Sequence, residues 1–229
     1  MFAIKPLSAI ALTASLMLSG LATPTSAAEP AATSEQKPSI EFANEYFYND
    51  AGEFQEEKAK DAIMALLKYH NYPIFDGIRE RIFVMDYKAG RFAEVGLSGI
   101  MYANHQVNQY MLLDIFLLPN QMLAEHWHVD GEETPAKREG WLVRNGISYI
   151  AGIGEDNMAD FPEVKIPQIH WDGKVSAKHI VKGEPGSFTD LAEILSRHWQ
   201  MAGPEGAIIT EVANYADGAA VRRSDPKMN

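Results

Sequence analysis

The chain has 229 residues, of which 46% are hydrophobic, which is enough for one well-packed core and predicts one main domain. Its formal net charge is −11 and no basic stripe offsets it, so nucleic acid, with its repelling phosphate backbone, is not an expected partner. The sequence has no cysteine, which excludes disulfides and thiol chemistry.

Residues 1–28 have the order of a secretory signal peptide. Lys5 precedes an apolar run that extends to about Ala22, and small residues follow at 25–28. The apolar run is short and contains serine and glycine, which favours cleavage over a retained membrane anchor. We therefore expect a periplasmic or secreted protein without stable membrane insertion after cleavage. A flexible leader is predicted over 29–52, because its first part is rich in Ala, Ser, Thr and Pro.

Residues 53–229 are predicted to form the folded domain. Apolar residues recur at helical spacing over 53–70, which predicts an amphipathic helix that ends before Pro73. Short runs rich in Ile, Val, Phe, Tyr and Leu follow, and a helical turn is expected near 189–200. Many short strands with little helix between them predict an all-β sandwich or barrel. The strand-like runs are 81–87, 91–103, 109–119, 140–154, 176–182 and 206–215.

The segment EHWHVDGEETPAKREG, residues 125–140, contains a candidate metal site. Side chains two residues apart in a strand lie on the same face, so His126 and His128 would project together into a barrel interior. Glu139 would add a carboxylate from the next strand, and His198 would be the fourth ligand from a distant strand. Three imidazole nitrogens and one carboxylate oxygen suit a divalent ion such as Mn, Fe, Co, Ni or Zn.

Less specific interpretations of these residues remain open. The two histidines could lie half-exposed on an edge strand, and Glu139 could be one more solvated acid in an acidic loop. His179 could take the place of His198 as the fourth ligand. The all-β context and the strand and turn that follow Glu139 favour the metal site.

Several segments resemble the D-lyxose isomerase family of the cupin superfamily, whose fold is a small β-barrel or jelly roll. They are VMDYKAGRFAEVGLSGIMYAN, LLPNQMLAEHWH, KREGWLVRNG and HWQMAGPEGAIITEV, followed by Asp217 and the motif SDP. The resemblance covers most of the mature domain, from about 83 to 226. It implies a single cupin-type jelly-roll barrel, preceded by the N-terminal amphipathic helix, and such barrels often form homodimers.

The resemblance also implies a metal-dependent aldose–ketose isomerase acting on a free sugar, such as D-lyxose and D-xylulose or D-mannose and D-fructose. A divalent ion, with manganese the first choice, would stabilise an enediolate while a base moves a proton between adjacent carbons. Resemblance and position in the apolar strand AIITEV nominate Glu211 as that base. Lys137 would steady oxyanion charge or relay a proton, although a solvated lysine is as well supported. Gln121, Trp199 and Asp217 would contact the sugar, although Gln121 could equally stabilise a turn.

Two other functions are compatible with the same residues. Without His198, a set of two histidines and one carboxylate would suit ferrous iron and a dioxygenase-type cupin. A barrel that has lost turnover would be a non-catalytic sugar-binding cupin, in which Glu211 could be a structural carboxylate paired with Arg144 or Arg222.

Overall fold

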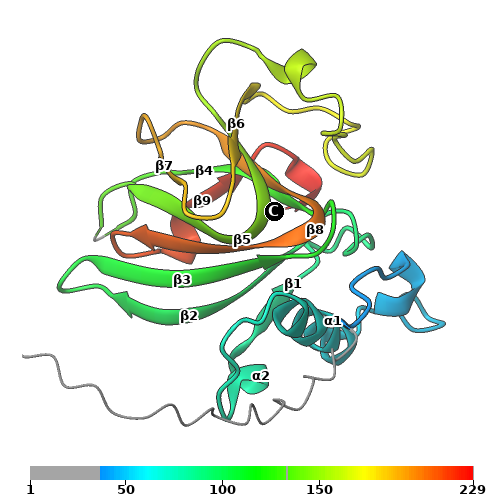
Figure 1. The fold of residues 1–229 in the computed structure, drawn as a ribbon. Helices are drawn as coiled ribbons and strands as arrows, with labels where there is room; N and C mark the ends of the chain where they lie inside the picture. Colours follow the sequence, from blue (N-terminus) through cyan, green and yellow to red (C-terminus); the bar gives the residue numbers. More distant parts are fainter. Residues whose placement is uncertain (1–36, 133, 229) are drawn as a thin grey trace, which may run out of the picture. The chain divides into compact units, whose positions relative to one another are not determined.

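Nine strands form one curled sheet in the computed structural model, which describes residues 37–132 and 134–228 (Figure 1). The strands are β1 (Phe83–Met85), β2 (Leu97–His105), β3 (Tyr110–Leu117), β4 (Met122–His128), β5 (Glu139–Gly152), β6 (His179–Gly183), β7 (Phe188–Asp190), β8 (His198–Ala213) and β9 (Val221–Arg223). The α-helices are α1 (Glu56–Tyr69) and α2 (Ile78–Arg81), and the short 3₁₀ helices are Asn44–Phe47, Met158–Asp160, Gly218–Ala220 and Pro226–Met228. The all-β prediction and the predicted amphipathic helix are therefore confirmed.

The long strands β5 and β8 organise the sheet. All the paired strands are antiparallel, and β8 pairs with β3 and β5 in its second half and with β4 and β5 in its first half. Both strands change direction at a glycine with positive φ, Gly146 at 70° and Gly206 at 72°. A Cβ on Gly146 would lie 2.0 Å from the carbonyl oxygen of Gly206, so this bend requires glycine. The bend curls the sheet, and the concave face becomes the barrel interior (Figure 1).

Helix α1 covers part of the outer face of the sheet. Its apolar residues are fully buried in the same cluster as Ile100, Phe116 and Ile208, and Phe116 lies opposite Ile208 across β3 and β8. Acidic residues in the first turn and Lys68 in the last turn suit the helix dipole. The helix therefore covers the outer face of the sheet at one end, and the inner face remains open to the barrel cavity. Its buried residues are Ala59, Ala62, Ile63, Leu66 and Leu67.

The predicted leader boundary at residue 52 needs correction. Phe47, within the segment 29–52, is fully buried, and Ile40 is also part of the cluster beneath α1. Burying a phenylalanine side chain contributes about 1.5–3 kcal/mol, which fixes this part of the chain on the domain. The prediction followed the polar composition at the start of the segment and overlooked the aromatic residues in its second part. The signal peptide predicted over 1–28 lies outside the described residues.

Alternate residues of β3 face opposite sides of the sheet. Leu113 and Ile115 face a cavity in the barrel, whereas Asp114 faces the helix side, where it contacts Tyr72 of the cluster beneath α1. The Asp114 carboxylate accepts hydrogen bonds from Tyr72 at 2.5 Å and from Thr210 at 2.6 Å, which compensates its burial. This network attaches the segment after α1 to the sheet.

Two further features of the described chain bear on the predictions. The helical turn expected near 189–200 is wrong, because Phe188–Asp190 is β7, His198 begins β8 and the loop between them is not helical.

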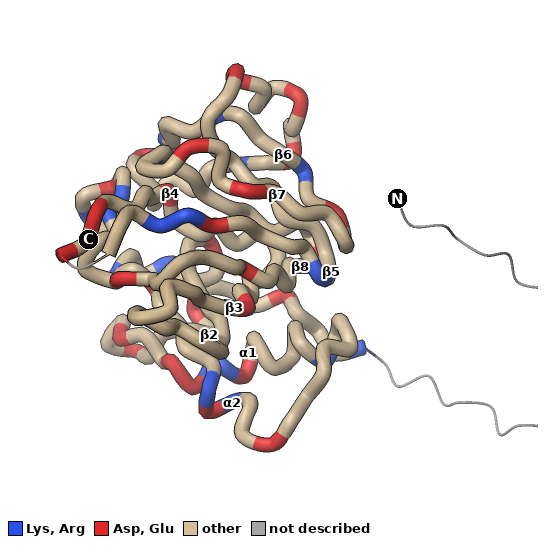
Figure 2. The backbone as a smooth tube through the Cα atoms, turned by 90° about the vertical axis from the view of Figure 1, so that its left-hand side faces the viewer, with Lys and Arg blue, Asp and Glu red and all other residues tan. Residues whose placement is uncertain are grey.

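Between residues 37 and 228, no described helix is long and apolar enough to span a bilayer. Acidic and basic residues are intermixed along the tube on the side that Figure 2 shows.

Candidate metal centre

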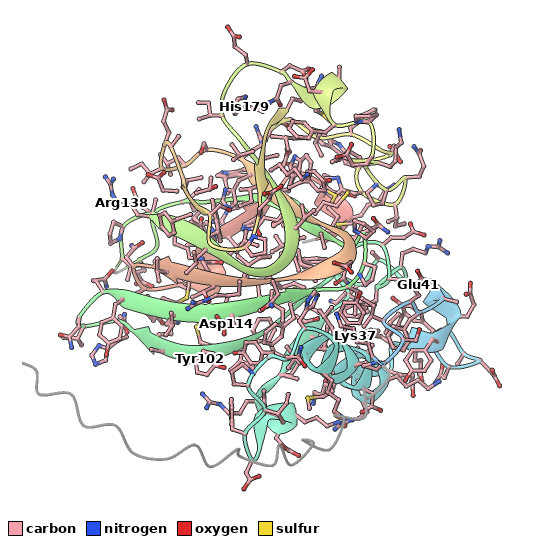
Figure 3. The ribbon with its side chains drawn as sticks, viewed as in Figure 1. Lys37, Glu41, Tyr102, Asp114, Arg138 and His179 are labelled. Atoms are coloured by element: carbon pink, nitrogen blue, oxygen red, sulfur yellow. The ribbon has the colours of Figure 1, made fainter. Side chains whose placement is uncertain are left out.

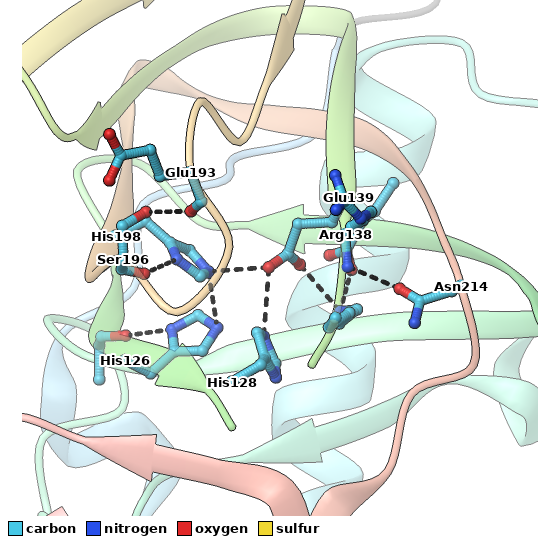
Figure 4. Close-up of polar contacts among 11 residues, drawn as sticks. His126, His128, Arg138, Glu139, Glu193, Ser196, His198 and Asn214 are labelled. Carbon is cyan, nitrogen blue, oxygen red and sulfur yellow. Dashed lines mark hydrogen bonds and ion pairs between the residues drawn. The ribbon is translucent and has the colours of Figure 1, made fainter. Parts of the chain in front are cut away.

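Three histidines from two neighbouring strands meet inside the barrel. His126 on β4 lies directly opposite His198 at the start of β8, and His128 shares the face of His126 because it is two residues further along β4. Each histidine offers a ring nitrogen, and these three atoms all lie within 4.8 Å of one another (Figure 4). The strand pairing therefore produces the convergence that the sequence predicted.

Glu139, the first residue of β5, completes the cluster. Its Oε1 lies 3.3 Å from Nε2 of His128 and 3.2 Å from Nε2 of His198 (Figure 4). His179 is elsewhere, at the start of β6, where its Nδ1 lies 2.9 Å from the carbonyl oxygen of Glu155 (Figure 3). The structure therefore places His198, and not His179, beside the other three predicted ligands.

The hydrogen bonds of the rings show that this group of atoms suits a cation. Nδ1 of His126 lies 2.9 Å from the carbonyl oxygen of Ala124, and Nδ1 of His198 lies 3.1 Å from that of Ser196. A carbonyl oxygen only accepts, so each Nδ1 carries the hydrogen and each Nε2 presents a lone pair. These two Nε2 atoms are only 3.1 Å apart. Two facing lone pairs repel unless a cation lies near both.

Two further atoms of the cluster are buried without a hydrogen-bond partner in the described structure, Nε2 of His128 and Oε1 of Glu139. An unsatisfied buried acceptor costs free energy, and a bound cation would remove that cost. Three imidazole nitrogens and one carboxylate oxygen are a donor set for a divalent transition metal. The residues present therefore fit the metal that the sequence predicted.

The protonation states of the cluster also favour metal binding. Burial lowers the pKa of His198 and lowers that of His126 well below its ordinary value, so both rings stay neutral. Burial by itself would raise the pKa of Glu139, but above all the attraction to Lys137 outweighs it and holds the pKa well below its ordinary value. Neutral imidazoles and an ionised carboxylate are the forms that bind metal.

Lys137 connects Glu139 to a second buried carboxylate, that of Glu211. Its Nζ lies 2.9 Å from Oε2 of Glu139 and donates a hydrogen bond to Oε1 of Glu211. Burial alone would lower the pKa of Lys137, but the two carboxylates outweigh burial and raise it. Glu211 is thus paired with Lys137, whereas Arg144, proposed as its structural partner, bonds to Thr210 instead.

The two carboxylates beside Lys137 differ in acidity. Burial raises the pKa of Glu211 to about 7, although the attraction of Lys137 opposes this shift. Glu139 stays ionised at the same pH, because its pKa is held well below the ordinary value. A pair of neighbouring carboxyl groups with separated pKa values is typical of a site that uses one as a proton carrier.

A cavity of about 360 Å³ opens onto the cluster. Asp217 lines it, which leaves its predicted contact with the sugar a prediction, while its Oδ1 also accepts a hydrogen bond from the backbone of Ala219 at 2.9 Å. Two polar lining residues, Gln200 and Arg223, were not among the predicted site residues. Gln200 could have been found, since it lies two residues after His198 on the same strand. Arg223 had no such signal, because the short strand β9 was not predicted.

Two predicted sugar contacts are wrong, because neither side chain reaches the cavity. Gln121 is fully buried in a turn, where its Oε1 accepts from the backbone of Leu118 at 3.0 Å and its Nε2 donates to the carbonyl oxygen of Phe92. Trp199 is also fully buried, and its Nε1 donates to the carbonyl oxygen of Ala177 at 2.8 Å. Trp199 is adjacent to His198 on β8, so it faces the opposite side of the strand.

No family model matches the chain, but individual proteins do. It is 27% identical over 172 residues to a D-lyxose/D-mannose isomerase from Thermosediminibacter oceani, which covers 75% of this chain and 92% of that protein. It is 25% identical over 171 residues to a D-lyxose ketol-isomerase from Cohnella laeviribosi, covering 75% and 91%. The resemblance predicted from the motifs is therefore confirmed over most of the domain.

Solved structures confirm the predicted fold. L-ribose isomerase from Acinetobacter sp. DL28 superposes with a TM-score of 0.56 at 13% identity, covering 80% of this chain and 89% of that one. L-ribose isomerase from Cellulomonas parahominis gives a TM-score of 0.55 at 14% identity, covering 76% and 88%. At this identity the likeness establishes the cupin-type barrel alone. A homodimer stays a prediction.

Proposed function

We propose that the protein is a metal-dependent aldose–ketose isomerase for a free sugar, with D-lyxose and D-xylulose or D-mannose and D-fructose as first candidates. The curated relatives named D-lyxose isomerase match most of the domain and support this reaction class. One observation within the site carries the proposal. Glu211 is a second buried carboxylate that pairs with Lys137, whereas Glu139 contacts two of the histidines directly. An isomerase needs such a separate base.

The proposed division of roles follows from the contacts. His126, His128, His198 and Glu139 would hold a divalent ion, which supplies electrophilic stabilisation of negative charge on the sugar oxygens when bound. Glu211 accepts the proton from one carbon and returns it to the adjacent carbon, and a pKa near neutrality suits both steps.

Lys137 has two tasks in the same scheme. Its ammonium group holds the carboxylates of Glu139 and Glu211 in place, and it offers positive charge where oxyanion charge develops. The buried setting strengthens this interaction, because Lys137 and Glu211 are each less than a tenth exposed. A solvated lysine, the alternative considered from the sequence, does not agree with this burial.

The test is a sugar assay with controlled metal content. Protein stripped with a chelator and reloaded with manganese is expected to interconvert D-lyxose and D-xylulose or D-mannose and D-fructose, and the stripped protein is expected to be inactive. Iron, cobalt, nickel and zinc are compared in parallel, with metal content measured by mass spectrometry. Substrate-dependent oxygen uptake without isomerisation would point to the dioxygenase-type cupin. Sugar binding without turnover in any metal form would point to the non-catalytic cupin.

We also propose that the mature enzyme acts in the periplasm or outside the cell. The support is the order of Lys5, the apolar run and the small residues within 1–28. The protein isolated from its native cells is expected to begin near Ala28 or Glu29 by N-terminal sequencing. A chain that still begins at Met1 in the soluble cytoplasmic fraction would contradict the proposal.

A further inference from the structure

The cavity beside the metal cluster has two walls of different chemistry. The strands β4, β5 and β8 contribute the histidines and both carboxylates, and the loop just before β5 contributes Lys137. The strands β1, β2 and β3 contribute only apolar side chains to the described lining. We call these six residues the apolar wall: Phe83, Met85, Leu97, Met101, Leu113 and Ile115.

Strand pairing makes the apolar wall continuous. Met85 lies opposite Leu97 across β1 and β2, and Met101 lies opposite Leu113 across β2 and β3. Between these pairs, a Cβ on Gly99 would lie 3.1 Å from Cζ of Phe83 and 3.0 Å from Cδ1 of Leu113. Because Gly99 has no side chain, the side chains of Phe83 and Leu113 can occupy the space beside it.

A sugar hydroxyl placed against this surface would lose its water and gain no hydrogen-bond partner from the wall itself, which is unfavourable. The guanidinium of Arg223 borders the wall only at Met85, where its Nη2 lies 3.8 Å from Sδ. A methyl group in the same place would gain from burial.

Leu113 lies opposite Glu211 across β3 and β8, so the apolar wall begins beside the proposed base and continues away from it over β2 and β1. The reacting carbons must lie beside Glu211 and Lys137, so the end of the sugar that does not react meets the part of the wall on β2 and β1. A sugar that carries a methyl group at that end matches both walls.

We propose that the preferred substrate is a 6-deoxyaldose, whose terminal methyl group packs on the apolar wall while its first two carbons meet Glu211. This inference rests on the proposed isomerase function and names the substrate class of the same site. It assigns the six apolar residues a role in specificity.

Three sugars provide a matched test. In their pyranose forms D-lyxose, D-mannose and 6-deoxy-D-mannose share one configuration and carry hydrogen, hydroxymethyl or methyl at C5. With manganese-loaded protein, kcat/KM for 6-deoxy-D-mannose is expected to exceed that for D-mannose by roughly tenfold to a hundredfold. It is expected to exceed the value for D-lyxose by about fourfold, the effect of burying one methyl group.

A pair of variants tests the wall itself. Met101→Gln places an amide on the wall at a residue that is 36% exposed, so folding should tolerate it. The preference for 6-deoxy-D-mannose over D-mannose should then fall several-fold. Leu112→Gln is the control, because Leu112 is 38% exposed and lies opposite Val212, outside the cavity lining. The preference of Leu112→Gln for 6-deoxy-D-mannose over D-mannose should equal that of the unmodified protein. Because the preference is a ratio of two kcat/KM values from the same preparation, a loss of folded protein lowers both values equally and leaves the ratio unchanged.

A binding measurement separates this inference from the proposed reaction. Calorimetric titration of the manganese-loaded Glu211→Gln variant with the same sugars needs no turnover. Tighter binding of 6-deoxy-D-mannose than of D-mannose supports the apolar wall, even if the unmodified protein isomerises neither sugar and the proposed reaction fails. Binding of D-mannose that is equal or tighter overturns the inference, even if both sugars are isomerised. An equal loss of preference in Met101→Gln and Leu112→Gln would also overturn it.

Discussion

Replacing Glu211 with glutamine is expected to lower kcat by about a hundredfold to ten-thousandfold, the usual range for loss of a general base. The amide cannot take up a proton, but it keeps the size of the carboxylate and an oxygen that accepts from Lys137. Metal content should stay unchanged, because the Glu211 carboxylate bonds to Lys137, whereas the Glu139 carboxylate contacts His128 and His198. The measurements are initial isomerisation rates and metal content by mass spectrometry.

An isotope experiment checks that the loss concerns proton transfer. In deuterated water the unmodified protein is expected to exchange the hydrogen on the carbon next to the carbonyl, and Glu211→Gln is expected to lose this exchange. Glu184→Gln is the matched control, since Glu184 is an exposed glutamate on the loop after β6. Near-normal turnover in Glu211→Gln would show that another group is the base.

Replacing His198 with alanine is expected to remove the metal and, with it, all measurable isomerisation. The change deletes one of three imidazoles and leaves a cavity beside Glu139. Loss of an outer-shell partner already weakens metal binding by 10- to 100-fold, and loss of a direct ligand should weaken it more. His126→Ala should behave in the same way, because its Nε2 lies 3.1 Å from that of His198. Metal titration of stripped protein measures both effects.

His179→Ala is the control for the histidine series. His179 was the alternative fourth ligand, but its ring lies at the start of β6 and contacts the backbone of Glu155. Metal affinity and turnover should therefore be unchanged in this variant. If His179→Ala lost metal while His198→Ala retained it, the assignment of the fourth ligand would be reversed.

The wrong predictions for individual residues have one physical origin. Gln121 and Trp199 are polar or aromatic residues near the metal motif, yet both are buried away from the cavity. The strand alternation that brings His198 inward turns Trp199 outward, into the cluster beneath the loop at Ala177. Chain proximity to a ligand is therefore a poor guide to substrate contact. The leader boundary was misplaced for a related reason, because only the packing beneath α1 shows that Phe47 belongs to the core.

The sequence by itself determined what depends on local period and motif. Alternating apolar runs indicated strands, helical spacing indicated α1, and the spacing of His126 and His128 placed two ligands on one face. Only the tertiary structure decided how distant strands align. The salt bridge of Lys137 with Glu211, the arrival of Arg223 from β9 and the apolar wall of β1 to β3 all depend on that register. Register is set by packing across the whole sheet, and no short stretch of sequence contains it.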